Sequence, residues 1–147
     1  MTYEALEDAL LTALEPLKTE GLKTLKSYGG EFSPDSFGQC PIAYPALMVC
    51  IPELTNETQG NLDRQALEVV VYVADRNLRG EGAARHGAYR GMEQARARLH
   101  RLPVAGAGRL ALQRESLVGY SAQLGLCVMQ ATYRLKMQHT IPFHEGA

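Results

Sequence analysis

Cysteine is scarce in this sequence: its 147 residues include three, and no two of them form a Cys-x-x-Cys pair or show the spacing of zinc ligands. With an odd count and no such pairing, we expect free thiols in a reducing compartment. Cys50 and Cys127 alternate with apolar residues in predicted strands, a pattern typical of small core side chains, whereas Cys40 lies in a predicted loop.

Long apolar runs are also missing. None approaches the ~18 residues of a membrane-spanning helix, and residues 1–8 lack the positively charged start of a signal peptide. We therefore expect a protein that neither crosses a membrane nor is secreted. The formal net charge of -1 argues against binding to nucleic acid or an anionic membrane through the overall field of the protein.

What is present resembles an ordinary soluble domain, with 46% hydrophobic and 21% charged residues. A chain of this length fits one domain and buries roughly two-thirds of the surface that its unfolded form exposes. We predict a single domain over residues 1–137 and a tail or arm over residues 138–147, around Pro142.

The charges are unevenly distributed. Seven of the 15 basic residues are arginines between positions 76 and 101, where the only acids are Glu81 and Glu93. These arginines are Arg76, Arg79, Arg85, Arg90, Arg96, Arg98 and Arg101. The first twenty residues have the opposite sign, with five acids against Lys18. This contrast predicts complementary surfaces, either within one molecule or between copies.

The first half of the chain reads as one helix and three strands. An amphipathic helix begins after Thr2, which can cap it, and ends near Gly21, with Pro16 bending or shortening its last turns. Strands are predicted over residues 22–28, 46–51 and 66–74. A long loop over residues 29–44 and a polar connection over residues 56–64 separate them.

The second half adds a helix over residues 83–101, a strand that begins at Leu110, a loose turn over residues 118–121 and a strand over residues 124–135. The predicted order is α-β-β-β-α-β-β. Strands grouped around a single helix favour an α+β fold, with an antiparallel or mixed sheet of four to five strands and both helices on one face.

The second helix carries an unusually small apolar stripe. Gly87 and Gly91 lie in it, and each costs about 1 kcal/mol relative to alanine in a helix. Close approach of this helix to the sheet or to a neighbouring subunit would compensate for that cost. The alternative is a ligand that lies against the bare backbone.

Three weaker patterns suggest chemistry, and each has a simpler explanation. The turn from Gly80 to Gly82 follows a strand and opens a helix, as in dinucleotide-binding proteins, but Arg85 replaces the third glycine. The run Gly119–Gln123 lacks the last glycine of a hydrolase nucleophile elbow and precedes a strand. His139, His144 and Glu145 could bind a metal but fall in the predicted tail. The sequence therefore predicts no catalytic residue, cofactor or metal.

The arginines of the second helix admit three interpretations: a solvated surface, pairing with carboxylates of a partner, or binding of nucleic acid. Arginine is favoured over lysine in interface ion pairs, and the aromatic residues expected of a single-strand binder are few. We take as candidate interface residues Arg76, Asn77, Arg79, Glu81, Arg85, Arg90 and Arg96.

These residues suggest a family. The run from Tyr72 to Glu81, followed by Gly87-Ala88-Tyr89-Arg90 and a helix ending at Leu99, resembles the Mu-like phage and prophage tail protein family. That family was long described as a domain of unknown function and is related to tail terminators in fold and genome position. The first helix and the strand after Pro45 are also similar, so the resemblance spans residues 3–136.

The resemblance implies a small structural protein that forms a hexameric ring, stops polymerisation of the tail tube and offers a surface for head attachment. It implies no enzymatic activity. The implied partners are copies of this chain, the tail tube protein, a sheath protein in contractile tails and head–tail connector proteins, with no membrane and no specific nucleic-acid recognition. The implied location is the head-proximal end of the virion tail, after assembly in the bacterial host cytoplasm.

Two alternatives stay open. One is a small nucleotide-binding protein or enzyme that uses the turn from Gly80 to Gly82. The other is a DNA-binding module that uses the arginine-rich helix.

Overall fold

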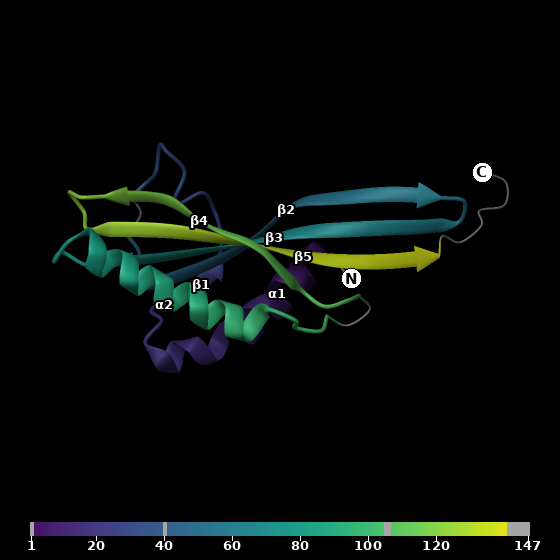
Figure 1. Cartoon of the computed structure of the whole chain (residues 1–147), viewed down its shortest axis with the longest axis horizontal. Coiled ribbons are helices and arrows are strands. Elements are labelled where there is room, and N and C mark those ends of the chain that lie inside the picture. The colour runs from purple at the N-terminus through teal and green to yellow at the C-terminus, as the bar shows by residue number, and fades with distance from the viewer. Residues whose placement is uncertain (1, 40, 105–106, 141–147) are drawn as a thin grey trace.

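The computed structural model describes residues 2–39, 41–104 and 107–140, with the backbone alone for residues 138–140 (Figure 1). Its elements, in chain order, are α1 (Tyr3–Leu14), the 3-10 helix η1 (Glu15–Glu20), β1 (Thr24–Ser27), β2 (Ala46–Gln59), β3 (Leu62–Arg76), α2 (Glu81–Leu99), β4 (Ala111–Ser121) and β5 (Leu126–Thr140). The five strands form one sheet in the order β1-β2-β3-β5-β4. Only β1 and β2 pair in parallel, so the sheet is mixed. The predicted α+β class and element order are confirmed.

The first helix begins and ends where the sequence predicts. Thr2 caps it by accepting a hydrogen bond at Oγ1 from the backbone N–H of Ala5, at 3.0 Å. Pro16 lies at the start of η1, because it lacks the N–H that would continue the α-helical ladder. Gly21, with φ of 110°, then closes η1 in the left-handed region.

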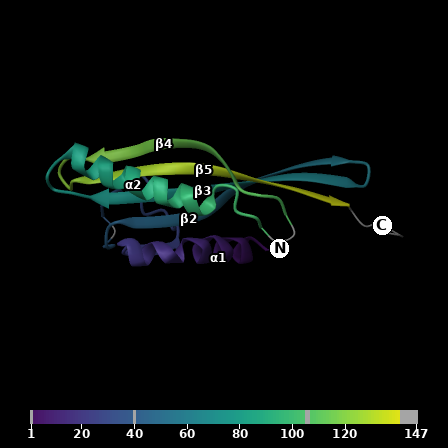
Figure 2. The same cartoon turned by 60° about the horizontal axis from the view of Figure 1, so that its bottom comes forward.

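Both helices pack on one face of the sheet (Figure 2). The main core lies between them and that face. It contains Leu6, Leu10 and Leu14 of α1, alternate residues of β3 from Leu67 to Val73, Met92, Ala95 and Leu99 of α2, and Ala131, Tyr133 and Leu135 of β5. Burial of this apolar surface is the main stabilising contribution to the fold.

The opposite face is covered at one end by the segment between β1 and β2, predicted as a long loop and free of helix and strand among its described residues. Phe32 is buried there against Met48, and the ring of Tyr28 stacks on that of Tyr72 with centroids 4.1 Å apart. The middle of β3 is therefore covered on both faces, which explains the continuous apolar run over residues 66–74.

The polar connection predicted over residues 56–64 is wrong. β2 continues through Pro52 to Gln59 and pairs with β3 up to Leu62, so that a tight turn at Gly60, with φ of 61°, joins two long strands. The register shifts between Cys50 and Glu53, and this irregularity accommodates a proline that cannot donate to a ladder. The strand ends were missed because their residues are polar on both faces.

The second half also differs from the prediction in its strand ends. The turn expected at residues 118–121 is part of β4, and the reversal lies at residues 122–125, with Gly125 at φ of 63°. Two register shifts, between Leu112 and Arg114 and between Leu117 and Gly119, obscure the alternation of β4. β5 extends to Thr140, three residues into the predicted tail, while residues 141–147 lie outside the described part.

The long strands form a projection that we call the arm. It consists of residues 53–59 of β2, 62–66 of β3 and 136–140 of β5, and it extends beyond both helices (Figure 1). Residues 53–59 are all exposed. The arm is a three-stranded sheet with little covering on either face.

Candidate functional site

The turn between β3 and α2 holds the first candidate residues. Arg76 donates from Nε to the carbonyl oxygen of Leu124 at 3.0 Å, and Asn77 donates its backbone N–H to the carbonyl oxygen of Gly125 at 2.8 Å. Asn77 Oδ1 accepts the backbone N–H of Arg79 at 3.0 Å. Arg76 and Asn77 thus join this turn to the β4–β5 connection, while the Arg79 side chain is exposed.

Gly125 is required by this junction. A Cβ at Gly125 would lie 2.6 Å from the carbonyl oxygen of Asn77, and its positive φ already disfavours other residues. No sequence motif indicates this contact, because the two turns are far apart along the chain.

The turn from Gly80 to Gly82 lacks the setting of a dinucleotide site. β3 has antiparallel neighbours on both sides, whereas the dinucleotide-binding unit pairs parallel strands around its helix. Gly80, with φ of 139°, provides the sharp entry into α2, and Glu81 in the first turn forms an ion pair with Arg85. This turn is explained by helix geometry and the helix dipole.

The small-residue stripe of α2 packs on the sheet. A Cβ at Gly87 would overlap the carboxylate of Asp75, and one at Gly91 would lie 2.5 Å from Cγ1 of Val73. Ala84 and Ala88 are fully buried beside them. Close approach of α2 to β3 therefore compensates for the helix-propensity cost of the two glycines. This is the predicted packing of the helix on the sheet.

A shallow groove of about 250 Å³ lies between the end of η1 and α2. Asp75 and Arg90 line it together with Glu20, Gly87, Gly91 and Gln94. Burial raises the pKa of Asp75 above its usual range, although the hydrogen bond from the N–H of Arg76 and the charge of Arg90 oppose this shift. The charged residues of the groove are thus two acids, Glu20 and Asp75, and one base, Arg90, rather than a cluster of metal ligands.

Two of the candidate arginines are paired within the molecule. Arg85 pairs with Glu81 one turn earlier on α2. Arg96 donates from Nε and an Nη atom to the two carboxylate oxygens of Glu115 on β4, at 2.8 and 2.9 Å. This forked pair joins α2 to β4 above Tyr133, whose pKa is raised mainly by burial.

The remaining arginines of this region are exposed. Arg79, Arg90, Arg98 and Arg101 take part in no ion pair within the described residues. On α1, Glu4 and Asp8 are likewise exposed without an ion pair in that part of the chain. The two helices therefore carry opposite charges that the described residues do not neutralise.

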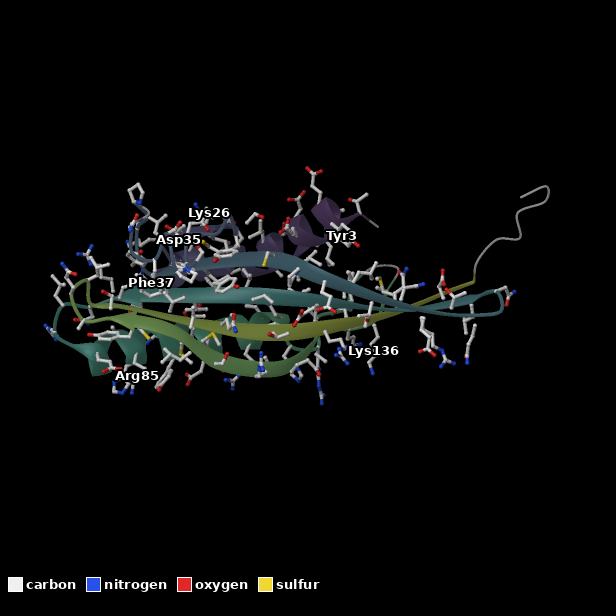
Figure 3. The ribbon with its side chains drawn as sticks, turned by 90° about the horizontal axis from the view of Figure 1, so that it is seen from above. Tyr3, Lys26, Asp35, Phe37, Arg85 and Lys136 are labelled. Atoms are coloured by element: carbon white, nitrogen blue, oxygen red, sulfur yellow. The ribbon has the colours of Figure 1, made fainter. Side chains whose placement is uncertain are left out.

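The two charged helices lie toward opposite flanks of the molecule. Figure 3 shows Tyr3 of α1 toward one margin and Arg85 of α2 toward the other, with the sheet between them in projection. α1 lies on the side of β1 and β2, and α2 on the side of β5 and β4. The molecule thus has an acidic flank and a basic flank.

The other sequence patterns have structural explanations. Ser121 Oγ accepts the backbone N–H of Leu124 at 3.3 Å and closes the turn after β4, so it is no nucleophile elbow. His100 Nδ1 accepts the N–H of Leu112 at 3.0 Å. Within the described residues, no group of three or more His, Cys, Asp and Glu side chains could hold a metal ion. The side chain of His139, and residues His144 and Glu145, lie outside that part.

The thiols match their prediction where they are described. Cys127 is buried and Cys50 is partly buried, both are free, and burial raises the pKa of each. Cys40 lies outside the described residues. No described helix is long and apolar enough to span a membrane.

Comparison with known proteins gives one family and a shared fold. The model of the family described as "Bacteriophage Mu, Gp37" matches residues 3–101, which include all of the candidate interface residues. A chain from the structure titled "Virion of native gene transfer agent (GTA) particle" matches with a TM-score of 0.63 and 12% identity, over 91% of this chain and 95% of that chain. At this identity the structural match shows a common fold. No curated protein matches.

Proposed function

The chain belongs to the Bacteriophage Mu, Gp37 family, and we propose that it is a phage tail terminator or tail-completion protein. In this role it is a structural subunit without enzymatic activity. It forms a ring, hexameric in tail terminators, that caps the tail tube and provides the surface to which the head attaches. Its place is the head-proximal end of the virion tail, next to the tube protein, the connector proteins and, in a contractile tail, the sheath.

The observation that carries this proposal is the charge polarity of the two flanks. Helix α1, which carries exposed acids, and helix α2, which carries exposed arginines, lie toward different sides of one molecule. In a head-to-tail contact, two different surfaces of identical subunits meet, and the contacts close into a ring when the rotation permits. An acidic flank facing a basic flank suits such a contact and disfavours a symmetric dimer, which would place like charges together.

The first test is the mass of the wild-type chain in solution, measured by light scattering and electron microscopy, alone and with tube protein. We expect rings in at least one condition. A strict monomer at high concentration in both conditions would contradict the proposal.

The second test reverses charge on the basic flank. Arg79→Glu with Arg90→Glu should weaken ring formation at least about tenfold, because each exposed pair contributes up to about 1 kcal/mol and the reversal adds repulsion. Circular dichroism should show a folded monomer. The matched control is Lys23→Glu with Arg109→Glu, which makes the same change in net charge at two exposed positions outside α2. Equal ring formation by both double variants would refute the role of these two arginines.

A further inference from the structure

The arm has an open edge for which the described residues supply no partner. β1 pairs with β2 only over residues 46–49, so residues 53–59 of β2 are bonded on their β3 side alone. The segment contains no lysine, no proline and no register shift after Glu53. Lysine, proline and register shifts are among the features that normally keep an edge strand from pairing with another chain.

The other edge of the arm is open only at its outer end, from Met137 to Thr140. β4 pairs with β5 only up to Arg134. Beyond it, the loop before β4 contributes one backbone hydrogen bond among the described residues, from the N–H of Gly108 to the carbonyl oxygen of Lys136, at 3.2 Å. Among the described residues, no strand lies beside the edge from Met137 to Thr140.

The two edges carry opposite charges on one face. In the sheet, Glu53 of β2, Glu68 of β3 and Arg134 of β5 lie in one row across the three strands. Thr55, Ala66 and Lys136 form the next row on the same face. Glu57 follows two residues after Thr55, so the acids of β2 and the bases of β5 point to the same face. Lys136 lies toward the same margin as Arg85 (Figure 3).

These charges are unsatisfied within the molecule. Four side chains are exposed and take part in no ion pair in the described part of the chain: Glu53, Glu57, Arg134 and Lys136. The polarity of the arm repeats that of the helices, with acids on the β2 side and bases on the β5 side.

We propose that the β2 edge of the arm pairs with the β5 edge of the arm of a second copy of this chain, forming a continuous sheet between subunits. β2 and β5 both run antiparallel to β3, so two copies in the same orientation bring these edges together as parallel strands. Because β4 covers β5 as far as Arg134, the pairing uses Met137 to Thr140, and the side chains of Arg134 and Lys136 lie at the inner end of that edge, on the same face as Glu53 and Glu57. Backbone pairing supplies affinity and the charges fix the register.

This inference rests on the proposed ring and names the contact that builds it. The two edges are different surfaces, so the contact is head-to-tail and repeats around the ring. A symmetric pairing of two β2 edges would place Glu53 and Glu57 of both copies together, which is destabilising.

The test is a charge exchange between two variants. Glu53→Lys with Glu57→Lys makes both edges basic, and Arg134→Glu with Lys136→Glu makes both edges acidic. Each variant alone should associate at least about tenfold more weakly than the wild type, because like charges meet at every contact. An equimolar mixture should regain rings, since every basic edge can then face an acidic one.

Ring formation is measured by sedimentation velocity and electron microscopy, and folding by circular dichroism. The matched control is Asp35→Lys with Glu93→Lys, which changes the net charge as the first variant does at exposed positions away from the arm. This control should form rings as the wild type does. Hydrogen exchange at residues 53–59 should slow on assembly of the wild type, because the free N–H groups of the edge become bonded.

The outcomes separate the two proposals. A wild-type chain that never forms rings, with or without tube protein, overturns the proposed function and this contact with it. Wild-type rings together with arm variants that assemble equally well overturn the contact alone. Loss of rings in both variants without recovery in the mixture also overturns it, because the two edges then do not face each other.

Discussion

At the residue scale, the positions that decide this structure are those where a side chain would not fit. Gly87, Gly91 and Gly125 each face an atom of another element at a distance that no Cβ tolerates. The sequence predicted the first two, because glycines inside a helix need a compensating contact. It could not show what they contact, since Asp75 and Val73 belong to the preceding strand.

Gly87 and Gly82 lie in the same helix and offer a matched pair of substitutions. Gly87→Ala should lower the free energy of unfolding by roughly 1–3 kcal/mol, because the new methyl group overlaps the carboxylate of Asp75. Gly82→Ala should leave it unchanged or raise it by up to about 1 kcal/mol, because nothing lies within 4 Å of a Cβ there. Urea unfolding of both variants checks this, and an equal effect of the two would contradict the packing described for α2.

Asp75 should make stability depend on pH. Burial raises its pKa in the folded state, so the folded protein binds the proton of Asp75 more tightly than the unfolded chain does. The contribution of this proton to the free energy of unfolding therefore declines as pH rises from the ordinary aspartate pKa through the raised one. Replacing Asp75 by Asn removes the ionisation. The stability of Asp75→Asn relative to wild type should therefore increase as pH rises from below the ordinary pKa of an aspartate to above the raised one.

Glu31 is a control, because its pKa is lowered rather than raised and its effect on stability should change with pH in the opposite direction. Burial tends to raise its pKa, but the hydrogen bond from Gly29 N–H, at 2.8 Å, and the ion pair with Lys26 lower it overall. The stability of Glu31→Gln relative to wild type should decrease as pH rises through the window below the ordinary glutamate pKa. Thermal unfolding of both variants between about pH 3 and pH 7 gives the two slopes, and slopes of the same sign would contradict these environments.

At the element scale, the sequence was most informative where one face of an element is buried. The stripes of α1 and α2 follow from the helical periodicity that burial of one face imposes, and the continuous apolar run in the centre of β3 follows from burial of both faces. The arm escaped prediction because strand periodicity needs a covered face, and residues 53–59 have none. Only the long pairing register with β3 identifies them as a strand.

The same limit applies to the candidate interface. A count of arginines cannot show which are already paired, and the structure divides them. Arg76 braces a turn, Arg85 and Arg96 bind carboxylates of their own chain, and Arg79 and Arg90 are left exposed. The acids and bases of the arm were missed because they are spread over three strands and form a pattern only once the register is known.

At the scale of the whole molecule, stability and assembly depend on different forces. The core is apolar apart from the hydroxyl of Tyr133, which is buried without a hydrogen-bond partner among the described residues. The surfaces proposed to join subunits, by contrast, carry exposed charges on opposite flanks. A change in solvent that screens charge should therefore separate the two processes.

Salt is the direct probe of this separation. Raising the ionic strength from about 0.1 M to about 1 M shortens the Debye length from about 10 Å to about 3 Å, which should weaken ring formation several-fold while the thermal midpoint of the monomer hardly moves. Sedimentation velocity and calorimetry at matched salt concentrations measure the two effects. The arm variants in which both edges repel should respond in the opposite sense and associate better at high salt. Rings that become more stable in salt would instead point to an apolar contact, for which exposed side chains such as Leu78 before α2 and Leu117 on β4 are candidates.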